Sequence, residues 1–454
     1  MTRKTDASLI HRQASAQAEK CLPSHATTLF TSRMENPMPQ KRRGVLIDTF
    51  AGWGGLSLGM EQAGFDVQVS ADVEPVNAAT HHHNFSYGRS LALDLHQDQT
   101  AALRRALPGG TDVDALTMGR PIDAIVGGPP CQGISAIGKK RGDDERNQLM
   151  ESFIEHGVRL EAKYLVMEQV PTLLQSQNEG ILDAIRERLL RAGYGMVDPQ
   201  VLRAVDFGVP QRRERVFLLI HRGDMPAPSY PVPTHGVEGD MFSKPTPTVA
   251  DAFDGLPDCD DHAELWDRDW VRTGFDAPTG RYGRLMRGLE NDAEDLSYRR
   301  DWDPGLLTCS QRTRHEDESI VRFMATEPGR NEPISRRHRL DPRGQSLTLR
   351  AGSNAEHGSF TAVVPIHTKG SRVITVREGC RLHGTPDWVR LSPSKIAAYR
   401  QLGNSVVPAL GRAVGQQIMK ALDLAPEAPS DIVPLGRDQD LFASTSIRSV
   451  AQAA

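Results

Sequence analysis

The stretch GVLIDTFAGWGGLSLGMEQAGFDVQVSADVEP, residues 44–75, reads as a strand, a glycine loop, a short helix and a second strand. Residues 44–50 are a continuous apolar run of strand length, and residues 51–65 supply the loop and a helix that ends at Gly64. Residues 66–75 form the second strand, which closes on acidic residues. Because glycines let a ligand approach the backbone closely, this unit predicts a ligand site at the end of the first strand.

The alternation of strands and helices continues to about residue 223. A helix is predicted from Val76 to about Asn84, and the later segments are strands at 122–128, 164–170 and 215–221 and helices within 144–163 and 178–195. This pattern predicts an α/β fold, a parallel sheet with helices on both faces. Ligands bind such sheets outside the carboxyl ends of the strands, and four chemically interesting residues fall there: Phe50, Asp72, Cys131 and Glu168.

Composition places the 454-residue chain among soluble globular proteins, with 38% hydrophobic and 25% charged residues. No stretch approaches the roughly 20 apolar residues that a membrane helix needs. The five cysteines are scattered and none forms a CxxC pair, which excludes a zinc site or disulfide framework and indicates a reducing, cytoplasmic location. The net charge of −4 leaves room for local basic patches, such as residues 330–350 with six arginines.

Changes in texture along the chain suggest five segments. Residues 1–43 are polar without apolar periodicity, residues 224–368 are irregular and rich in Pro, Gly and charges, and residues after 425 are again polar. We therefore expect a disordered tail at 1–43, a first domain at 44–223, a loop-rich second domain at 224–368, a return to the first domain at 369–425, and a disordered tail at 426–454.

Cys131, in the segment GGPPCQGIS at 127–135, follows a predicted strand at the mouth of the sheet. A free cysteine is most often a small buried hydrophobe, but here two prolines stiffen the loop and direct the thiol. Glu168 ends the apolar strand YLVMEQV, where an acid is costly to bury unless it is protonated or paired with an arginine. The residues alone leave both alternatives open for each side chain.

Several segments in a fixed order carry a family resemblance: DTFAGWGGLSLGMEQAGF, GGPPCQGIS, MEQV, QRRERVF and RQLGNSVVPALGRAVGQQI. They resemble the successive motifs of the bacterial DNA (cytosine-5)-methyltransferases, from about residue 44 to 423. The resemblance implies a Rossmann-like S-adenosylmethionine-dependent methyltransferase sheet and a smaller, irregular target-recognition domain at 224–368. It also implies methyl transfer from S-adenosylmethionine to C5 of a cytosine that is flipped out of double-stranded DNA.

The catalytic residues that the resemblance implies are Cys131, Glu168, Arg213 and Arg215. The Cys131 thiolate would add to C6 of the base, and Glu168 would protonate or hydrogen-bond N3. Arg213 and Arg215 would hold the cytosine O2 and the Cys131 loop. The family usually has Glu-Asn-Val where this chain has Glu168-Gln169-Val170, so the positioning of the Pro-Cys loop is open.

The resemblance also implies two sets of binding residues. The cofactor set is Phe50, Gly52, Gly54, Gly55, Leu56, Asp72, Asp94, Pro129, Leu149, Asn404 and Ser405. Phe50 would stack on the adenine, Asp72 would bind the ribose hydroxyls and Asp94 the adenine amino group. The DNA set is Gln132, Ser135, Gln211, Thr348 and Leu349. No metal is implied, the expected partner is double-stranded DNA, the expected state is a monomer, and a cognate restriction endonuclease is a candidate partner.

Three alternatives remain. An RNA cytosine-5 methyltransferase would use Cys309, in LTCS, as its nucleophile and Cys131 as the release residue. A tRNA-methylating branch of the DNA-type family is a second enzyme alternative. A catalytically inactive DNA-binding regulator would need none of the catalytic side chains. The triplet HHH at 81–83 suggests a metal site, but its side chains point in different directions on a helix, which favours a solvated face.

Overall fold

The computed structural model of the chain describes residues 40–107, 121–130, 148–236, 244–352 and 364–441. These residues all belong to one compact unit, Pro39–Ala454. None of the helices among them is long and apolar enough to cross a bilayer.

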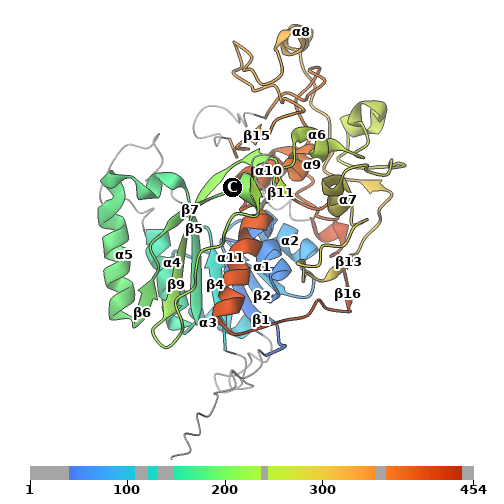
Figure 1. Cartoon of the computed structure of the whole chain (residues 1–454). Coiled ribbons are helices and arrows are strands. Elements are labelled where there is room, and N and C mark those ends of the chain that lie inside the picture. Colours follow the sequence, from blue (N-terminus) through green and yellow to red (C-terminus); the bar gives the residue numbers. More distant parts are fainter. Residues whose placement is uncertain (1–39, 108–120, 131–147, 237–243, 353–363, 442–454) are drawn as a thin grey trace, which may run out of the picture. The chain divides into compact units, whose positions relative to one another are not determined.

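An eight-stranded sheet lies at the centre, with the strand order β3-β2-β1-β4-β5-β9-β6 and with β7 paired to β9 (Figure 1). Its strands are β1 Gly44–Thr49, β2 Phe65–Asp72, β3 Arg89–Ala92, β4 Ala124–Gly127, β5 Tyr164–Gln169, β6 Tyr194–Met196, β7 Gln200–Arg203 and β9 Glu214–Arg222. The order reverses between β1 and β4, so the crevice expected for a ligand lies above these two strands.

Strands β1 to β5 are all parallel, as the alternating pattern predicts. Strand β9 is antiparallel to β5, however, which corrects the expectation of a wholly parallel sheet. The reason is that no α-helix separates β9 from the preceding strands β6 and β7, so the chain turns back along the edge of the sheet. The short strands β3, β6 and β7 carry few apolar residues and were not predicted.

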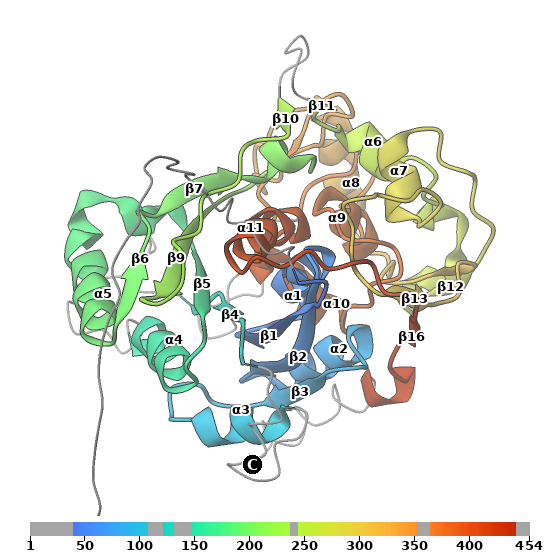
Figure 2. The ribbon, with the colours of Figure 1, turned by 60° about the horizontal axis from the view of Figure 1, so that its bottom comes forward.

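Helices cover both faces of the sheet, because side chains of successive strand residues point to opposite sides (Figure 2). Leu46 packs in the core shared with α1 and α11, whereas Val45 and Ile47 pack in the core shared with α3, α4 and α5. The bounds are α1 Gly55–Gln62, α2 Pro75–Asn84, α3 Thr100–Ala106, α4 Gln148–Arg159, α5 Glu179–Arg191 and α11 Pro408–Ala421.

Helix α11 comes from the far end of the sequence and packs directly on α1. A Cβ atom on Gly59 would lie 2.2 Å from the Pro408 carbonyl oxygen, and one on Gly415 would lie 2.7 Å from Cβ of Ala63. Glycines therefore let the two helix backbones meet closely. Helix α11 thus completes the core on the α1 side of the sheet.

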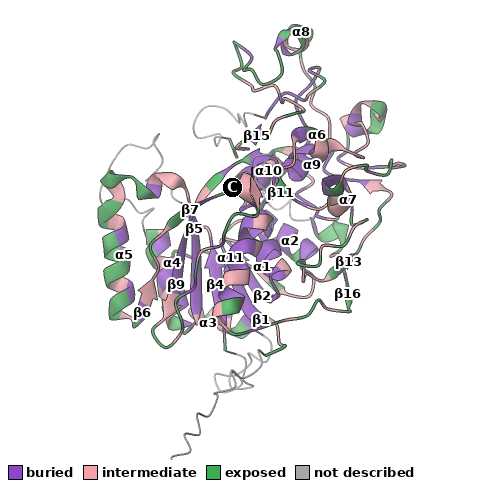
Figure 3. Cartoon of the chain, in the orientation of Figure 1, coloured by how far each residue is buried: buried purple, intermediate pink, exposed green. Residues whose placement is uncertain are grey.

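The part of the chain between β9 and α10 is built from short elements. Its strands are β10 His235–Gly236, β11 Lys244–Pro245, β12 Val271–Arg272, β13 Arg299–Asp301, β14 Leu306–Leu307 and β15 Ser346–Leu347. Strand β8, Gln211–Arg212, lies just before β9 and pairs with β15. Its helices are α6 Val249–Phe253, α7 Arg281–Met286, α8 Asp317–Ala325 and α9 Val376–Leu382, followed by α10 Lys395–Asn404. Short 3-10 turns lie at Pro171–Leu174, Ser176–Asn178, Ala204–Phe207, Cys259–Asp261 and Ala263–Trp266. Figure 3 shows buried residues throughout the sheet, whereas α8 and α5 turn exposed faces to solvent.

Order extends beyond both predicted tail boundaries. Arg42 forms an ion pair with Asp123 at 2.5 Å and Arg43 forms one with Asp66 at 2.6 Å, within the stretch expected to be disordered. Strand β16, Ile432–Pro434, pairs in parallel with β13. The predicted start of the C-terminal tail at residue 426 is therefore too early. These polar segments are ordered by backbone pairing and ion pairs, which apolar periodicity does not reveal. Residues 1–39 and 442–454 lie outside the described residues.

Candidate active site

The carboxyl ends of four strands meet at one edge of the sheet. Thr49 of β1 is in register with Ala71 of β2 and with Gly127 of β4, and Gly127 is in register with Met167 of β5. The residues that follow these positions therefore lie side by side: Phe50, Asp72, Gly128 and Glu168. The sequence predicts this convergence, and it brings the glycine loop, the acid and the segment before Cys131 to one place.

Glu168 is buried and pairs with Arg215 of the neighbouring strand, with the Arg215 Nε atom 2.6 Å from Oε1. The approach is not aligned along an N–H bond, so the contact is a charge pair rather than a linear hydrogen bond. A Cβ atom added to Gly128 would lie 2.9 Å from Oε2 of Glu168. The carboxylate thus lies against the chain three residues before Cys131, and of the two sequence alternatives the arginine-paired one is found.

Gln169 stands where the family usually has asparagine, and it contacts the Pro-Pro-Cys segment directly. Its side chain is buried, and its Nε2 atom donates a hydrogen bond of 2.8 Å to the carbonyl oxygen of Pro129. The longer side chain therefore fixes the first proline of the Pro-Pro-Cys segment from the adjacent strand. Cys131 itself, together with the predicted DNA contacts Gln132 and Ser135, lies outside the described residues.

Arg213 contacts three backbone segments near the site. It is fully buried, and its two Nη atoms donate to the carbonyl oxygens of Leu349, Gly403 and Ser405 at 3.0, 3.0 and 2.7 Å. Burial, followed by the neighbouring charge of Arg215, lowers the pKa of Arg213. Arg213 therefore positions three backbone segments around the site.

Two of the predicted DNA contacts also serve the scaffold. Gln211 is fully buried, where its Oε1 atom accepts the Leu349 N–H at 3.3 Å and its Nε2 atom lies 3.2 Å from Nδ1 of His383. Leu349 is buried as well. Thr348 is partly exposed and donates from Oγ1 to the carbonyl oxygen of Arg212 at 2.8 Å, so it alone of the three faces outward.

The glycine loop turns sharply between β1 and α1. Phe50, Gly52 and Gly54 have φ angles of 59°, 58° and 103°, and the left-handed conformation is strained for phenylalanine. A Cβ atom on Gly55 would lie 2.0 Å from Oγ of Ser405, so the segment after α10 packs against the loop. Leu56 is buried beneath it.

The remaining predicted cofactor residues surround this loop. Asp72 is buried, and its carboxylate accepts the N–H of Gly52 at 3.0 Å and the side-chain amide of Asn77 at 3.1 Å. Burial raises the pKa of Asp72, and these two hydrogen bonds oppose the rise. The Leu93 N–H donates to the Asp72 carbonyl at 2.9 Å, which brings exposed Asp94 to the same edge. Of the others, Pro129 is buried, Leu149 is partly buried and Asn404 is exposed.

The loop fits a nucleoside-bearing cofactor such as S-adenosylmethionine. Open space surrounds the position of a Cβ atom on Gly52, with no atom of the described residues within 4 Å. Val73, next to Asp72, leaves 61% of its apolar surface exposed, which suits contact with a flat base. Buried Asp48 has an oxygen, Oδ1, without a hydrogen-bond partner in the described structure. A carboxylate oxygen of this kind suits a cationic amino group.

Asp48 belongs to a buried polar chain that the sequence analysis missed. Ser57 Oγ donates to Asp48 Oδ2 at 2.5 Å and lies 2.9 Å from Nε2 of His81, whose Nδ1 lies 2.9 Å from Oγ of both Ser70 and Ser90. Burial raises the pKa of Asp48 to about 7 and lowers that of His81 to about 3. The sequence feature that could have predicted this chain is an acidic residue within the apolar run at 44–50. The same feature, an acid in an apolar strand, identified Glu168.

The expectation of a solvated histidine face is wrong for two of the three histidines at 81–83. His81 and His83 are buried, whereas His82 is exposed. Helix α2 packs between the sheet and the C-terminal segment, and the Gly436 N–H donates to the carbonyl oxygen of His83 at 2.8 Å. The metal alternative gains no support among the described residues, since these three histidines form no metal-binding group.

Cys309 has no access to a substrate. It is buried, with φ of 57°, and its Sγ accepts the N–H of Leu391 at 3.4 Å. Its carbonyl oxygen accepts the N–H of Arg377 at 2.8 Å. A thiol held this way acts as a structural residue, which disfavours the RNA-type mechanism.

Comparisons with known proteins identify the family of this chain. The family model of C-5 cytosine-specific DNA methylases matches residues 45–420. The type II methyltransferase M.XorII of Xanthomonas oryzae is 43% identical over 88% of this chain and 90% of its own, and M1.HphI of Haemophilus parahaemolyticus is 29% identical over 82% and 86%. A crystal structure of an Escherichia coli prophage protein assigned as a DNA modification methyltransferase has a TM-score of 0.63 at 28% identity, covering 84% of this chain and 99% of that one. The chain belongs to the C-5 cytosine-specific DNA methylase family, and it is a DNA cytosine-5-methyltransferase.

Proposed function

We propose that this enzyme transfers a methyl group from S-adenosylmethionine to C5 of a flipped-out cytosine in a specific double-stranded DNA sequence, through a covalent bond between Cys131 and C6. The observation that carries the proposal is the contact of Glu168 with Arg215 on one side and with the Gly128 backbone on the other. It gathers an acid, a fixed cation and the segment leading to the thiol around one point at the sheet edge.

The glycine loop and its neighbours would hold the cofactor. Bound S-adenosylmethionine supplies an electrophilic methyl group on a positively charged sulfur. Asp72 would accept from the ribose hydroxyls, Phe50 and Val73 would contact the adenine, and the free oxygen of Asp48 would face the amino group of the methionine part. The close contact of Ser405 with Gly55 fixes the wall of this site from the C-terminal half of the chain.

The protein makes a poorly reactive carbon nucleophilic. The Cys131 thiolate donates an electron pair to C6, and the C5–C6 double bond shifts toward C5. Glu168, in its carboxylic acid form, donates its proton to N3, and Arg215 stabilises the carboxylate that remains. C5 then takes the methyl group, a base removes the C5 proton, and the returning electron pair expels the Cys131 sulfur as thiolate. Gln169 supports each step by holding Pro129.

Recognition of the DNA would fall to residues 224–368, which we propose as the target-recognition domain. Base flipping is required because C5 and C6 cannot be reached inside a stacked duplex. Thr348 is partly exposed and lies next to Arg212 through the pairing of β15 with β8, so it would be available to contact the DNA. Phosphate contacts would set the register, and loop side chains would read the bases.

Trapping on duplex DNA containing 5-fluorocytosine tests the mechanism, because fluorine at C5 cannot leave as a proton does and the Cys131 adduct persists. We expect a denaturation-resistant adduct with the unaltered protein and with Cys309→Ala, and none with Cys131→Ala. An adduct that survives Cys131→Ala would refute the mechanism. Faster methylation of RNA than of DNA would refute the substrate.

We further propose that the enzyme is a monomeric, cytoplasmic member of a type II restriction-modification pair. The similarity to type II methyltransferases supports this assignment. Bisulfite sequencing of DNA from a host that expresses the enzyme should reveal one methylated motif, and a cognate endonuclease would be blocked by that methylation. An obligate dimer in sedimentation would contradict the monomer.

A further inference from the structure

Asp72, the acid at the end of β2, is held by three donors of the protein itself. Its Oδ1 atom accepts the Glu74 N–H at 2.9 Å and the side-chain amide of Asn77 at 3.1 Å, and its Oδ2 atom accepts the Gly52 N–H at 3.0 Å. A carboxylate has about four acceptor positions on its two oxygens. The described contacts therefore fill both positions of Oδ1 and leave one on Oδ2, beside the open space at Gly52.

The amide of Asn77 connects Asp72 to a distant helix. Its Oδ1 atom accepts a hydrogen bond of 3.1 Å from Nε2 of Gln401, a residue of α10 that lies 324 positions further along the chain. Gln401 is only 5% exposed, so water has little access to its side chain. A buried amide of this kind is costly to leave without its partners, and the bond to Asn77 is therefore strongly favoured.

The direction of the hydrogen bonds in this chain of side chains is fixed at both ends. At one end the Ser392 N–H, which can only donate, meets Oε1 of Gln401 at 2.9 Å. The Gln401 amide therefore turns its two N–H groups to Oδ1 of Asn77 and to Oγ1 of Thr80, at 3.1 and 3.0 Å. At the other end an ionised Asp72 can only accept, and Asn77 supplies the donor. Exchanging the oxygen and nitrogen of either amide would break these contacts.

The segment that carries Gln401 holds helix α2 at both of its ends. Gln401 reaches the N-terminal half of α2 through Asn77. At the last residue of α2, Asn84 exchanges two hydrogen bonds with the backbone of Arg390: its Nδ2 atom donates to the carbonyl oxygen at 2.9 Å, and its Oδ1 atom accepts the N–H at 3.0 Å. The position of Asn77 beside Asp72 thus depends on residues from the C-terminal part of the chain.

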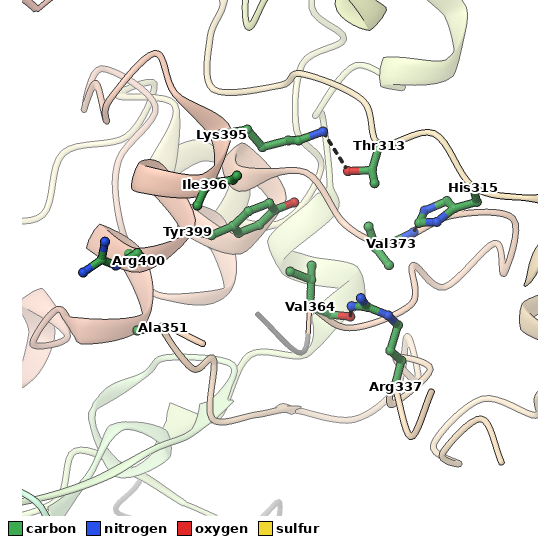
Figure 4. A pocket seen from close by; sticks show the side chains of 10 residues that line it. All are labelled: Thr313, His315, Arg337, Ala351, Val364, Val373, Lys395, Ile396, Tyr399 and Arg400. Atoms are coloured by element: carbon green, nitrogen blue, oxygen red, sulfur yellow. Dashed lines mark hydrogen bonds between the residues drawn. The ribbon is translucent and has the colours of Figure 1, made fainter. Parts of the chain in front are cut away.

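Helix α10 is itself fixed on two faces. Ala398, Gln401 and Leu402, which are three and four positions apart, belong to its buried face. On another face, Lys395 donates to Thr313 Oγ1 at 3.2 Å, beside the small pocket drawn in Figure 4. Because both faces are engaged, α10 presents the Gln401 amide in one orientation.

The chain of amides acts on the charge of Asp72 as well as on its position. Burial raises the pKa of Asp72, and the hydrogen bonds from the Gly52 N–H and from Asn77 oppose that rise. An asparagine that turned its oxygen toward Asp72 would repel the carboxylate instead. Gln401 prevents this reversal, because its own N–H group occupies Oδ1 of Asn77.

We propose that Gln401 and Asn77 are positioning residues for the cofactor, which aim the remaining acceptor position of Asp72 at a ribose hydroxyl of S-adenosylmethionine. This role rests on the proposed function, which assigns the ribose to Asp72, and extends it to two residues that act through Asp72. It couples recognition of the ribose to the docking of α10. A chain in which α10 is displaced therefore binds the sugar poorly even though Asp72 is intact.

Calorimetric titration of the full chain with two probes tests this role. S-adenosylhomocysteine, the product left after methyl transfer, and its 2′,3′-dideoxy analogue differ only in the ribose hydroxyls, so the ratio of their dissociation constants measures recognition of the ribose. We expect a ratio of roughly 10–100 for the unaltered protein, the strength of a hydrogen bond to a charged group. Asn77→Ala and Gln401→Met should each lower the ratio several-fold. Gln401→Glu, which keeps the volume but turns an oxygen toward Asn77, should lower it as well.

Asn84→Ala is the matched control for a general loss of packing around α2. It removes the contacts with Arg390, so it should lower the melting temperature and leave the ratio unchanged. In a protein that already carries Asn77→Ala, Gln401→Met should not lower the ratio further, because Gln401 acts through Asn77. A ratio that falls as far in Asn84→Ala, or that falls further in the double variant, would show a merely structural role and overturn the proposal.

Failure of this role and failure of the proposed function give different results. An unaltered protein that does not bind S-adenosylhomocysteine, or does not methylate duplex DNA, contradicts the proposed function. An unaltered protein that binds both probes equally removes Asp72 from ribose recognition and overturns the positioning role with it. Normal methylation together with an unchanged ratio in Asn77→Ala and Gln401→Met overturns the positioning role alone.

Discussion

The central sheet and the irregular segment between β9 and α10 are held together by different forces. Strand residues such as Leu165 and Phe217 are completely buried among other apolar side chains. The irregular segment instead buries arginine pairs, among them Arg300 with Glu61 at 2.8 Å and Arg381 with Asp387 at 2.7 Å. Short helices and strands bury too little apolar surface for that burial alone to fix their positions. A bidentate arginine–carboxylate pair fixes the positions of the two segments it joins, because its hydrogen bonds are directional. The sheet is therefore held by apolar burial, and the irregular segment is held by directed ion pairs.

Replacing Glu168 by glutamine should have the largest effect, since it changes the chemistry at the sheet edge. We expect methylation to slow roughly 10²–10⁴-fold, the range for loss of a general acid or base. Glu214→Gln, an exposed neighbour on β9, is the matched control and should retain full activity. Single-turnover methylation of a cognate duplex measures both, and an unimpaired Glu168→Gln enzyme would remove this residue from the mechanism.

Breaking the Arg300–Glu61 pair probes the other kind of stabilisation. Both side chains are at most 1% exposed, so Glu61→Gln should leave an uncompensated buried cation and lower the free energy of unfolding by about 3–5 kcal/mol. Denaturant unfolding measures the loss. Glu427→Gln, in the exposed pair with Lys41, should cause no measurable change.

A double variant sharpens this test. Glu61→Leu combined with Arg300→Met removes both charges and should recover part of the stability that Glu61→Gln loses. If the double variant is less stable than Glu61→Gln, then the hydrogen bonds that Arg300 donates to the carbonyl oxygens of Asn84 and Tyr298 matter more than its charge.

Asp48 should make stability depend on pH in an unusual direction. Its folded pKa is about 7, above the roughly 3.9 of an unfolded aspartate, so the folded chain binds more protons between these values. The contribution of Asp48 to the free energy of unfolding therefore falls as pH rises from about 4 to about 7 and is constant beyond. Asp48→Asn should abolish this slope and be the more stable protein at about pH 8, by on the order of 4 kcal/mol at most.

Denaturant unfolding of both proteins across this pH range measures how the free energy of unfolding changes with pH. The other titrating groups contribute equally to both curves, so the difference between the two slopes reports Asp48. Parallel curves would show that Asp48 is ionised in the folded chain at all these pH values.

Gln169→Leu should give the smallest effect. It removes one buried hydrogen bond, to the Pro129 carbonyl, and we expect a loss of about 1–3 kcal/mol in stability. Since Pro129 precedes Cys131 by two residues, adduct formation with 5-fluorocytosine DNA should slow about tenfold. Gln169→Asn tests whether a shorter side chain can still reach the Pro129 carbonyl oxygen. Full activity would mean that the usual family residue fits this backbone equally well.

The sequence predicts the sheet well and the irregular segment poorly, for the reason that separates them physically. The apolar runs at 44–50 and 164–170 predict two strands and place Glu168 at the end of one of them. No local pattern predicts that Arg300 forms an ion pair with Glu61, because 239 residues separate them. The pairing of β9, the scaffold role of Arg213 and the buried His81 depend on the same kind of distant contact, so periodicity and motif spacing do not reveal them.

The packing of α11 on α1 has a consequence for synthesis. About 350 residues lie between the two helices, so at roughly 5–20 residues per second the ribosome leaves the apolar face of α1 uncovered for roughly 20–70 s. During that interval one apolar face of the first half of the sheet and of α1 is not covered by α11. The incomplete chain is then prone to aggregation or to binding by chaperones. The methylase consequently becomes active only after α11 has emerged, and a chain that stops before residue 408 would lack one side of its core.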